Sequence, residues 1–140
     1  MKILLPVDGS EYTKRMLGWL AAHNELLRPD NEYTIFTAVA PVPAHAARFL
    51  DRSILDAYYR EQAEGVLRTV TAFADQQGWK FRATHALGDP ADAIAMLAKA
   101  EKPDVIVMGT HGRSALGNVV LGSVANGVLA RCDTPVLLVR

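Results

Sequence analysis

The sequence predicts an α/β protein built on a doubly wound, five-stranded parallel sheet. Short β-rich runs alternate with amphipathic stretches, the connections between strands are long enough to hold helices, and several strands are apolar almost throughout. Parallel strands need such crossovers, and strands buried on both faces read as continuous apolar runs. We therefore expect one domain over residues 1–140, with strand order 3-2-1-4-5 and helices on both faces of the sheet.

The first strand and the first helix are separated by a short polar turn. Lys2 to Val7 is apolar almost throughout and stops at the sequence Asp8-Gly9-Ser10. Pro6 cannot donate to a ladder, so we expect it at the carboxyl end of the strand, where neighbouring strands diverge. From Ser10, the predicted N-cap, apolar residues recur at helical spacing as far as Leu27.

The next segment predicts a strand, a long connection and a long helix. Tyr33 to Val39 is the strand, and the connection Pro41 to Arg52 contains two prolines. Such a connection is long for this fold; a flap over the carboxyl ends of the strands and a solvated crossover loop both remain open. Apolar residues at steps of three and four from Leu55 to Phe73 predict the helix, which Gly78 closes.

The second half of the chain continues the alternation. Lys80 to Ala86 alternates polar and apolar residues, which predicts a half-exposed edge strand. A cap followed by proline, Asp89-Pro90, starts a third helix. Asp104 to Met108 predicts a buried strand. The last helix is expected at Ser123 to Arg131, and the last strand at Pro135 to Val139.

The composition argues against several classes of protein. Fifteen basic residues offset 15 acidic ones, which gives no reason to expect a nucleic-acid or membrane-surface partner. The lone Cys132 excludes an internal disulfide framework and fits a reducing compartment. No segment approaches the roughly 20 apolar residues of a membrane span, and the first apolar run is too short for a signal peptide. We expect a soluble cytoplasmic protein.

A glycine-rich loop follows the fourth predicted strand. The sequence "GTHGRSALGNVVLGS", residues 109 to 123, contains four glycines, which is more than one turn needs. In doubly wound sheets, ligands bind beyond the carboxyl ends of the strands at the point where the strand order reverses. Asp8 ends the first strand and Gly109 ends the fourth, which would be its neighbour. The loop and Asp8 are therefore expected to line one crevice.

Several well-known phosphate-binding motifs do not match. No G-x-G-x-x-G follows a strand, and Gly112 to Asn118 has the Walker A spacing with asparagine in place of the required lysine. A receiver domain would need an acidic cluster where only Asp8 stands, and the loop after the first strand is a poor match for a flavodoxin phosphate cradle. His111 has no carboxylate or second histidine nearby in sequence, so we expect no catalytic or metal-binding role for it.

The spacing Gly109-x2-Gly112-x9-Gly122-Ser123 resembles the ATP-binding signature of the universal stress protein family. The opening "ILLPVDGS" resembles the first strand and loop of that family, and the resemblance covers essentially the whole chain. It implies a small ATP-binding protein that acts as a dimeric stress-response or metabolic switch, not an enzyme. A slow ATPase or self-phosphorylating enzyme, and an interaction module without nucleotide, are the alternatives.

The resemblance also implies how the nucleoside would be held. Asp8 would bind the ribose hydroxyls or a metal, although its simpler role is to cap the first helix. Backbone at the positions of Val7, Val39 and Met108 would border the adenine. The expected ligand is ATP or ADP, and whether Mg²⁺ is held through the phosphates stays open.

The phosphates would lie at the amino end of the last helix. Free N–H groups of Gly122 and Ser123, with the positive end of the helix dipole, would bind phosphate oxygens. Arg113 would add a charge-assisted contact. The full set of expected binding residues is Pro6, Val7, Asp8, Val39, Met108, Gly109, Gly112, Arg113, Gly122, Ser123 and Val124.

Two further features concern packing and assembly. Gly127 falls inside the predicted last helix at a cost of about 1 kcal/mol relative to alanine, which indicates close packing or a short helix. The strand Val136 to Val139 is expected at the sheet edge, where few protective residues accompany it. Antiparallel pairing with the same strand of a second copy would form a homodimer, which a proline at Leu137 is expected to disrupt.

Overall fold

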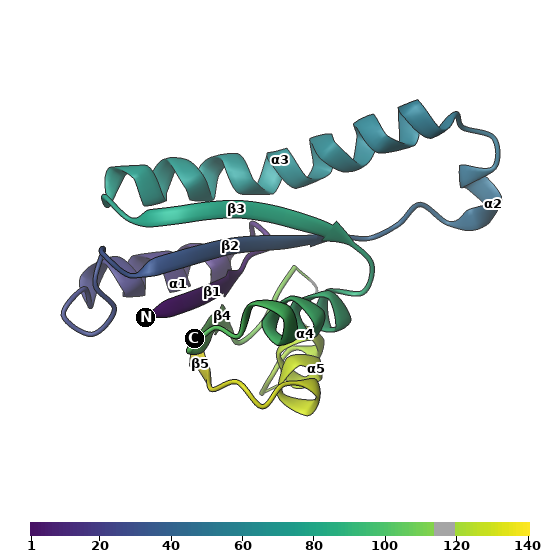
Figure 1. Cartoon of the computed structure of the whole chain (residues 1–140). Coiled ribbons are helices and arrows are strands. Elements are labelled where there is room, and N and C mark those ends of the chain that lie inside the picture. The colour runs from purple at the N-terminus through teal and green to yellow at the C-terminus, as the bar shows by residue number, and fades with distance from the viewer. Residues whose placement is uncertain (114–119) are drawn as a thin grey trace.

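Five parallel strands form one sheet in the predicted order, β3-β2-β1-β4-β5 (Figure 1). The structure is a computed structural model and describes residues 1–113 and 120–140. The strands are β1 (Lys2–Pro6), β2 (Glu32–Val39), β3 (Lys80–Leu87), β4 (Val105–Gly109) and β5 (Val136–Val139). The helices are α1 (Glu11–Ala22), α2 (Ala44–Ala47), α3 (Arg52–Gln76), α4 (Pro90–Glu101) and α5 (Ser123–Arg131).

Helices cover both faces of the sheet, as predicted. Helices α1 and α3 pack on one face, and α4 and α5 pack on the other. Along β1, Ile3 and Leu5 point to the first layer and Leu4 points to the second. All three are almost fully buried. Burial on both faces explains why the strand is apolar at successive positions.

The first helix is shorter than its apolar pattern predicts. Ser10 is the N-cap, and its hydroxyl accepts a hydrogen bond from the Thr13 amide at 3.4 Å. The helix ends at Ala22, so the predicted extension to Leu27 is wrong. Leu27 is buried, but the chain brings it into the core through a turn in which the His23 carbonyl accepts its N–H at 3.2 Å. The apolar spacing therefore identified Leu27 as a buried residue, but the backbone at this position does not belong to the helix.

The connection between β2 and α3 contains the short helix α2, which the sequence did not predict. Four residues are too few to show a helical period. The Tyr59 hydroxyl accepts a hydrogen bond from the Val42 amide at 2.9 Å and ties the connection to α3. None of residues 41–52 lines the cavity described below, so this segment does not form a flap over it.

Strands β1 and β4 separate where the strand order reverses. They pair only at Ile3–Val105 and Leu4–Ile106, whereas β1 and β2 remain paired through Pro6. Pro6 is the last residue of β1, so its predicted position is confirmed. The divergence leaves an opening between β1 and β4 at their carboxyl ends, where doubly wound sheets bind ligands.

Gly127 lies within α5, which runs the full predicted length. A Cβ at Gly127 would lie 2.5 Å from the Cβ of Ala91 on α4, closer than carbon atoms can approach. The prediction of close packing is therefore confirmed, and the alternative of a short helix is wrong. Cys132 follows α5 and is half-buried; burial, followed by the nearby Asp133, raises the pKa of its thiol.

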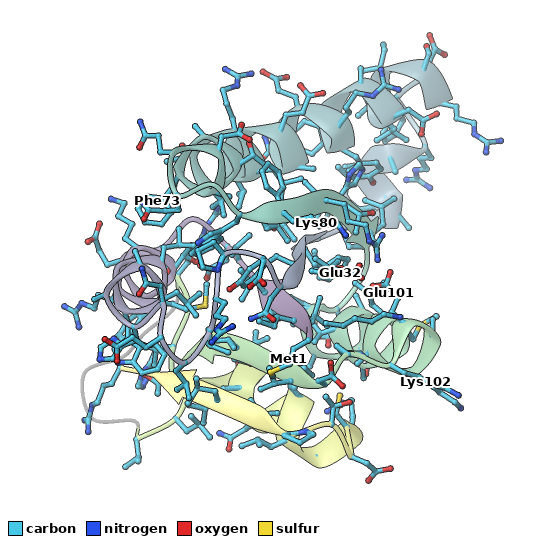
Figure 2. The ribbon with its side chains drawn as sticks, turned by 60° about the vertical axis from the view of Figure 1, so that its left-hand side comes forward. Met1, Glu32, Phe73, Lys80, Glu101 and Lys102 are labelled. Atoms are coloured by element: carbon cyan, nitrogen blue, oxygen red, sulfur yellow. The ribbon has the colours of Figure 1, made fainter. Side chains whose placement is uncertain are left out.

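The two edges of the sheet differ in character. The outer strand β3 carries charged side chains, and Lys80 Nζ pairs with Glu32 Oε1 on β2 at 3.0 Å (Figure 2). Arg82 pairs with Glu101 of α4. The other outer strand, β5, is Val-Leu-Leu-Val. Charged residues protect an edge from pairing with other chains, so β5 is the less protected of the two edges.

The ladder between β4 and β5 shows which amides of β5 face outward. Amides of the β4 segment donate to the carbonyl oxygens of Pro135 and Val139 at 2.9 and 3.0 Å. Since backbone groups alternate along a strand, Leu137 also faces β4, while Val136 and Leu138 face outward. A proline at Leu137 would therefore disrupt the inner ladder, and the sequence-based choice of that position was wrong.

Within the described ranges, no helix combines the length and apolar character needed to cross a membrane.

Candidate functional site

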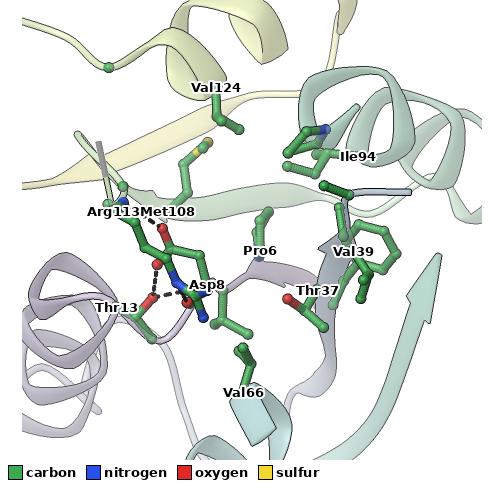
Figure 3. Close-up of a pocket in the computed structure, with 18 of the residues that line it drawn as sticks. Pro6, Asp8, Thr13, Thr37, Val39, Val66, Ile94, Met108, Arg113 and Val124 are labelled. Atoms are coloured by element: carbon green, nitrogen blue, oxygen red, sulfur yellow. Dashed lines mark hydrogen bonds between the residues drawn. The ribbon is translucent and has the colours of Figure 1, made fainter. Parts of the chain in front are cut away.

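A cavity of about 660 Å³ opens at the carboxyl ends of β1, β2 and β4 (Figure 3). It lies where the strand order reverses, and its volume is in the range of small-molecule sites. All of the binding residues predicted from the sequence line it: Pro6, Val7, Asp8, Val39, Met108, Gly109, Gly112, Arg113, Gly122, Ser123 and Val124. The roles assigned to them stay predictions.

The cavity has walls on both sides of the sheet. Met108 belongs to the layer of α4 and α5, together with Ile94. Val7 belongs to the layer of α1 and α3, against which Val66 packs. The residues expected to border an adenine therefore approach from different faces, at the strand ends that form the floor of the cavity. This floor is apolar, which suits a flat, weakly polar group.

Asp8 joins the loop after β1 to the glycine-rich loop after β4. Its Oδ1 accepts hydrogen bonds from the Ser10 amide and the Thr13 hydroxyl, each at 2.9 Å. Its Oδ2 accepts one from the Arg113 amide at 3.1 Å. Because Ser10 caps α1, the simpler role considered for Asp8, capping that helix, is wrong. A carboxylate offers about four acceptor positions, so one position on Oδ2 remains for a ligand.

Gly112 and Arg113 lie directly against Asp8. A Cβ at Gly112 would be 2.6 Å from Asp8 Oδ2, so a side chain at this position would break the contact between the two loops. Arg113 Nε donates to the backbone carbonyl of Asp8 at 2.7 Å. The guanidinium is exposed and lines the cavity, which leaves its other N–H groups for an anion.

Gly109 and Gly122 also permit close approach between segments of the chain. A Cβ at Gly109 would lie 2.8 Å from the Cβ of Tyr12, and one at Gly122 would lie 3.0 Å from the Cα of His111. The glycine spacing is therefore needed to bring α1, β4 and the start of α5 together. Making room for phosphates would be a second role of these glycines, besides packing.

The amino end of α5 opens onto the cavity. The Gly122 amide donates to the Thr110 carbonyl at 2.7 Å, so its N–H is not free, contrary to the prediction. The next three amides, of Ser123, Val124 and Ala125, lie in the first turn, where a helix offers them no acceptor. Gly122 is the N-cap and has no side chain to cap them. These amides and the helix dipole favour an anion here.

His111 lines the cavity beside the amino end of α5. Its ring contacts that of Tyr12, with centroids 4.9 Å apart, and its Nδ1 lies 3.0 Å from the Thr110 hydroxyl. Among the residues that the structure describes, no three His, Cys, Asp or Glu side chains gather as a metal site would require.

Sequence reasoning missed the part of the wall that α3 supplies. Tyr58, Gln62 and Val66 of this helix line the cavity, as does Thr37 of β2. A helix of 25 residues spans about 37 Å, whereas the eight residues of β3 span about 26 Å. The helix must therefore extend past the strands, as Figure 1 shows at the carboxyl end of β3. This difference in length between the helix and the strand is the signal from which the additional wall could have been predicted.

The comparisons with known proteins all point to one family. The model of the universal stress protein family matches residues 1–140. A universal stress protein of Thermus aquaticus is 34% identical over 142 residues, which cover 99% of this chain and 97% of the relative.

Solved structures agree with this comparison. MJ0577 of Methanocaldococcus jannaschii has a TM-score of 0.83 and 28% identity, covering 99% of this chain and 94% of the other. A universal stress protein solved in complex with cAMP has a TM-score of 0.66 and 26% identity, covering 100% and 96%.

Proposed function

Because this chain belongs to the universal stress protein family, we propose that it binds an adenine nucleotide in the cavity and works as a small regulatory switch. ATP is the proposed ligand. The observation that carries the proposal is the open amino end of α5, which meets the same cavity as the apolar strand ends of β1, β2 and β4. One end of this cavity suits phosphate and the other suits a base.

The chemistry of the walls supports this orientation. The amides of Ser123, Val124 and Ala125 would donate to phosphate oxygens, and Arg113 would supply the opposite charge. The remaining acceptor position on Asp8 Oδ2 suits a ribose hydroxyl. A relative that was solved with cAMP supports an adenine nucleotide as the class of ligand.

We also propose that Mg²⁺ accompanies ATP and is held through the phosphates. Asp8 already accepts three hydrogen bonds within the chain, so its carboxylate has little capacity left for a metal. We propose binding, without steady turnover, as the role of the site. Sustained ATP hydrolysis well above the uncatalysed background would contradict this part of the proposal.

Nucleotides are expected to stabilise the protein selectively. At a free concentration 100 times its Kd, ATP should add about 2.7 kcal/mol to the free energy of unfolding. GTP at the same concentration should add much less. The reason is the apolar floor of the cavity, which would leave the additional polar groups of guanine unpaired. Thermal unfolding with each nucleotide measures the difference. Equal shifts with both would remove the preference for adenine, and no shift with either would remove the proposal.

The nucleotide that the purified protein carries can be identified directly, with no ligand added. Mass spectrometry of the gently purified protein, after denaturation, is expected to release ATP or ADP in near-stoichiometric amount. A protein that is purified without nucleotide and binds none on addition would instead act as an interaction module.

We propose further that the protein forms a homodimer through β5. Among the described residues this strand pairs only with β4, and its four residues are all apolar, so no charged side chain protects the open edge. Antiparallel pairing of two β5 strands across a two-fold axis would satisfy the outward amides of Val136 and Leu138 in both copies.

Leu138→Pro is expected to give a folded monomer. Proline removes an outward amide and obstructs pairing with the second copy, while the inner ladder to β4 stays intact. Light scattering measures the mass. Leu138→Ala is the matched control, because it shortens the same side chain but keeps the amide, and it should remain a dimer. A Leu138→Pro protein that dimerises with unchanged affinity would place the interface on another surface.

A further inference from the structure

Two polar residues are buried in the described part of the chain, Thr13 and Thr37, with exposed fractions of 5% and 3%. Thr13 has clear partners, because its hydroxyl donates to Asp8 Oδ1 at 2.9 Å and accepts the Asp8 amide at 3.2 Å. The hydroxyl of Thr37 has no hydrogen-bond partner among the residues that the structure describes. Among the described residues, the buried hydroxyl of Thr13 is therefore hydrogen-bonded and that of Thr37 is not.

The Thr37 hydroxyl opens onto the cavity. In the described residues, every side-chain oxygen or nitrogen that is shut off from solvent has a hydrogen-bond partner. Since the Thr37 oxygen has none, it must reach open space, and Thr37 is one of the residues that line the cavity. Figure 3 shows this oxygen directed toward the interior, on the side of Asp8 and Val66.

Packing alone does not require a hydroxyl at this position. Thr37 shares its face of β2 with Ile35 and Val39, which are buried and apolar. Valine has nearly the same shape and is equally favoured in strands, so it would fill the site without a polar atom. In the empty cavity water can reach this hydroxyl, so a ligand that displaces the water must offer a hydrogen-bond partner or leave the hydroxyl unpaired at a cost.

The position of Thr37 indicates which part of a ligand it meets. The anion-binding end of α5 follows β4, Asp8 follows β1 in the middle, and Thr37 lies near the end of β2. Strand β2 is two strand spacings, about 10 Å, from β4. A nucleotide with phosphates at α5 and ribose at Asp8 would therefore present its base to Thr37.

We propose that Thr37 is a specificity-determining residue whose hydroxyl hydrogen-bonds the base of the bound nucleotide. The inference rests on the proposed function, since it takes the phosphates to lie at α5. A hydroxyl can donate and accept, so it can pair with a ring nitrogen or with the amino group of adenine. The side chains of Val7, Val39 and Met108 at the floor of the cavity are apolar, so this hydrogen bond would supply orientation as well as affinity.

Calorimetric titration with AMP and with ribose 5-phosphate tests the inference, because ribose 5-phosphate has the sugar and phosphate of AMP but a hydroxyl in place of the base. Thr37→Val is expected to weaken AMP and ATP binding by about three- to tenfold and to leave ribose 5-phosphate binding unchanged. Thr37→Ser keeps the hydroxyl and should recover most of the loss. The matched control is Thr34→Val on the same strand, whose hydroxyl bonds Glu101 at 3.3 Å outside the cavity, and it should bind all probes as the wild type does.

The outcomes separate the two proposals. If the wild-type protein binds no AMP or ATP, the proposed function fails and this inference fails with it. If both nucleotides bind and Thr37→Val retains full affinity, only the inference is overturned. An equal loss for AMP and ribose 5-phosphate would also overturn it, since the hydroxyl would then contact the sugar or the phosphate.

Discussion

Asp8→Ala is expected to lower the free energy of unfolding by about 3 kcal/mol and to weaken ATP binding by about 100-fold or more. The substitution removes the acceptor for the Ser10 amide, the Thr13 hydroxyl and the Arg113 amide together. It therefore weakens the attachment between the two loops, in which the bond from Arg113 Nε to the backbone carbonyl of residue 8 remains. It also leaves the buried Thr13 hydroxyl without its acceptor. Urea unfolding and calorimetric titration with ATP measure the two effects.

Two control variants separate stability from binding at Asp8. Asp8→Asn keeps an oxygen for Ser10 and Thr13 but offers no second acceptor to the Arg113 amide, so its losses should be intermediate. Asp104→Ala removes a carboxylate that accepts the Lys2 amide at 2.7 Å, far from the cavity, and should lower stability while ATP affinity is unchanged. Wild-type ATP affinity in Asp8→Ala would show that the nucleotide does not depend on this junction.

Gly127→Ala is expected to destabilise the protein by about 2 kcal/mol, although alanine is the better helix former. The added methyl group would lie 2.5 Å from Ala91 Cβ and 3.2 Å from an Nη atom of Arg131. Ala91 sits on the first turn of α4, so the clash would force α4 and α5 apart. Chemical denaturation measures the change.

Gly65→Ala is the matched control for this prediction. Gly65 also lies inside a helix, α3, and a Cβ there would meet no described atom within 4 Å apart from its chain neighbours and the backbone of its own helix. The same substitution should therefore stabilise the protein by about 0.5–1 kcal/mol, through helix propensity alone. The same substitution at two helical glycines would then change the free energy of unfolding in opposite directions. Stabilisation in both variants would mean that the contact between α4 and α5 relaxes at little cost.

Most of the fold could be predicted from the sequence because its causes are local. The run from Lys2 to Val7 is apolar because β1 is buried on both faces, and that pattern is visible without the structure. The helix starts at Ser10 and Asp89 were found because each cap bonds an amide three residues away. Leu27 misled the prediction, since burial by a turn produces the same spacing as burial by a helix.

The candidate site was only partly predictable. The glycine spacing and Asp8 led to the cavity because they are recognisable in sequence and end neighbouring strands. The occupied amide of Gly122 was not foreseen, since its acceptor, the Thr110 carbonyl, is not a neighbour in the sequence. Tyr58 and Gln62 were missed because helical spacing identifies the face that packs on the sheet, but not how far the helix extends past it.

The sequence by itself determined the alternation of strands and helices and their caps, because periodicity and capping act between residues a few positions apart. The strand order was expected from the doubly wound fold class and not from a local pattern. Only the tertiary structure decided that Gly127 meets Ala91, that Asp8 holds Arg113, and that the hydroxyl of Thr37 is left facing the cavity. Each of these depends on distances between segments far apart in the chain. Such distances are set when the two helical layers pack on the sheet, and no local pattern records them.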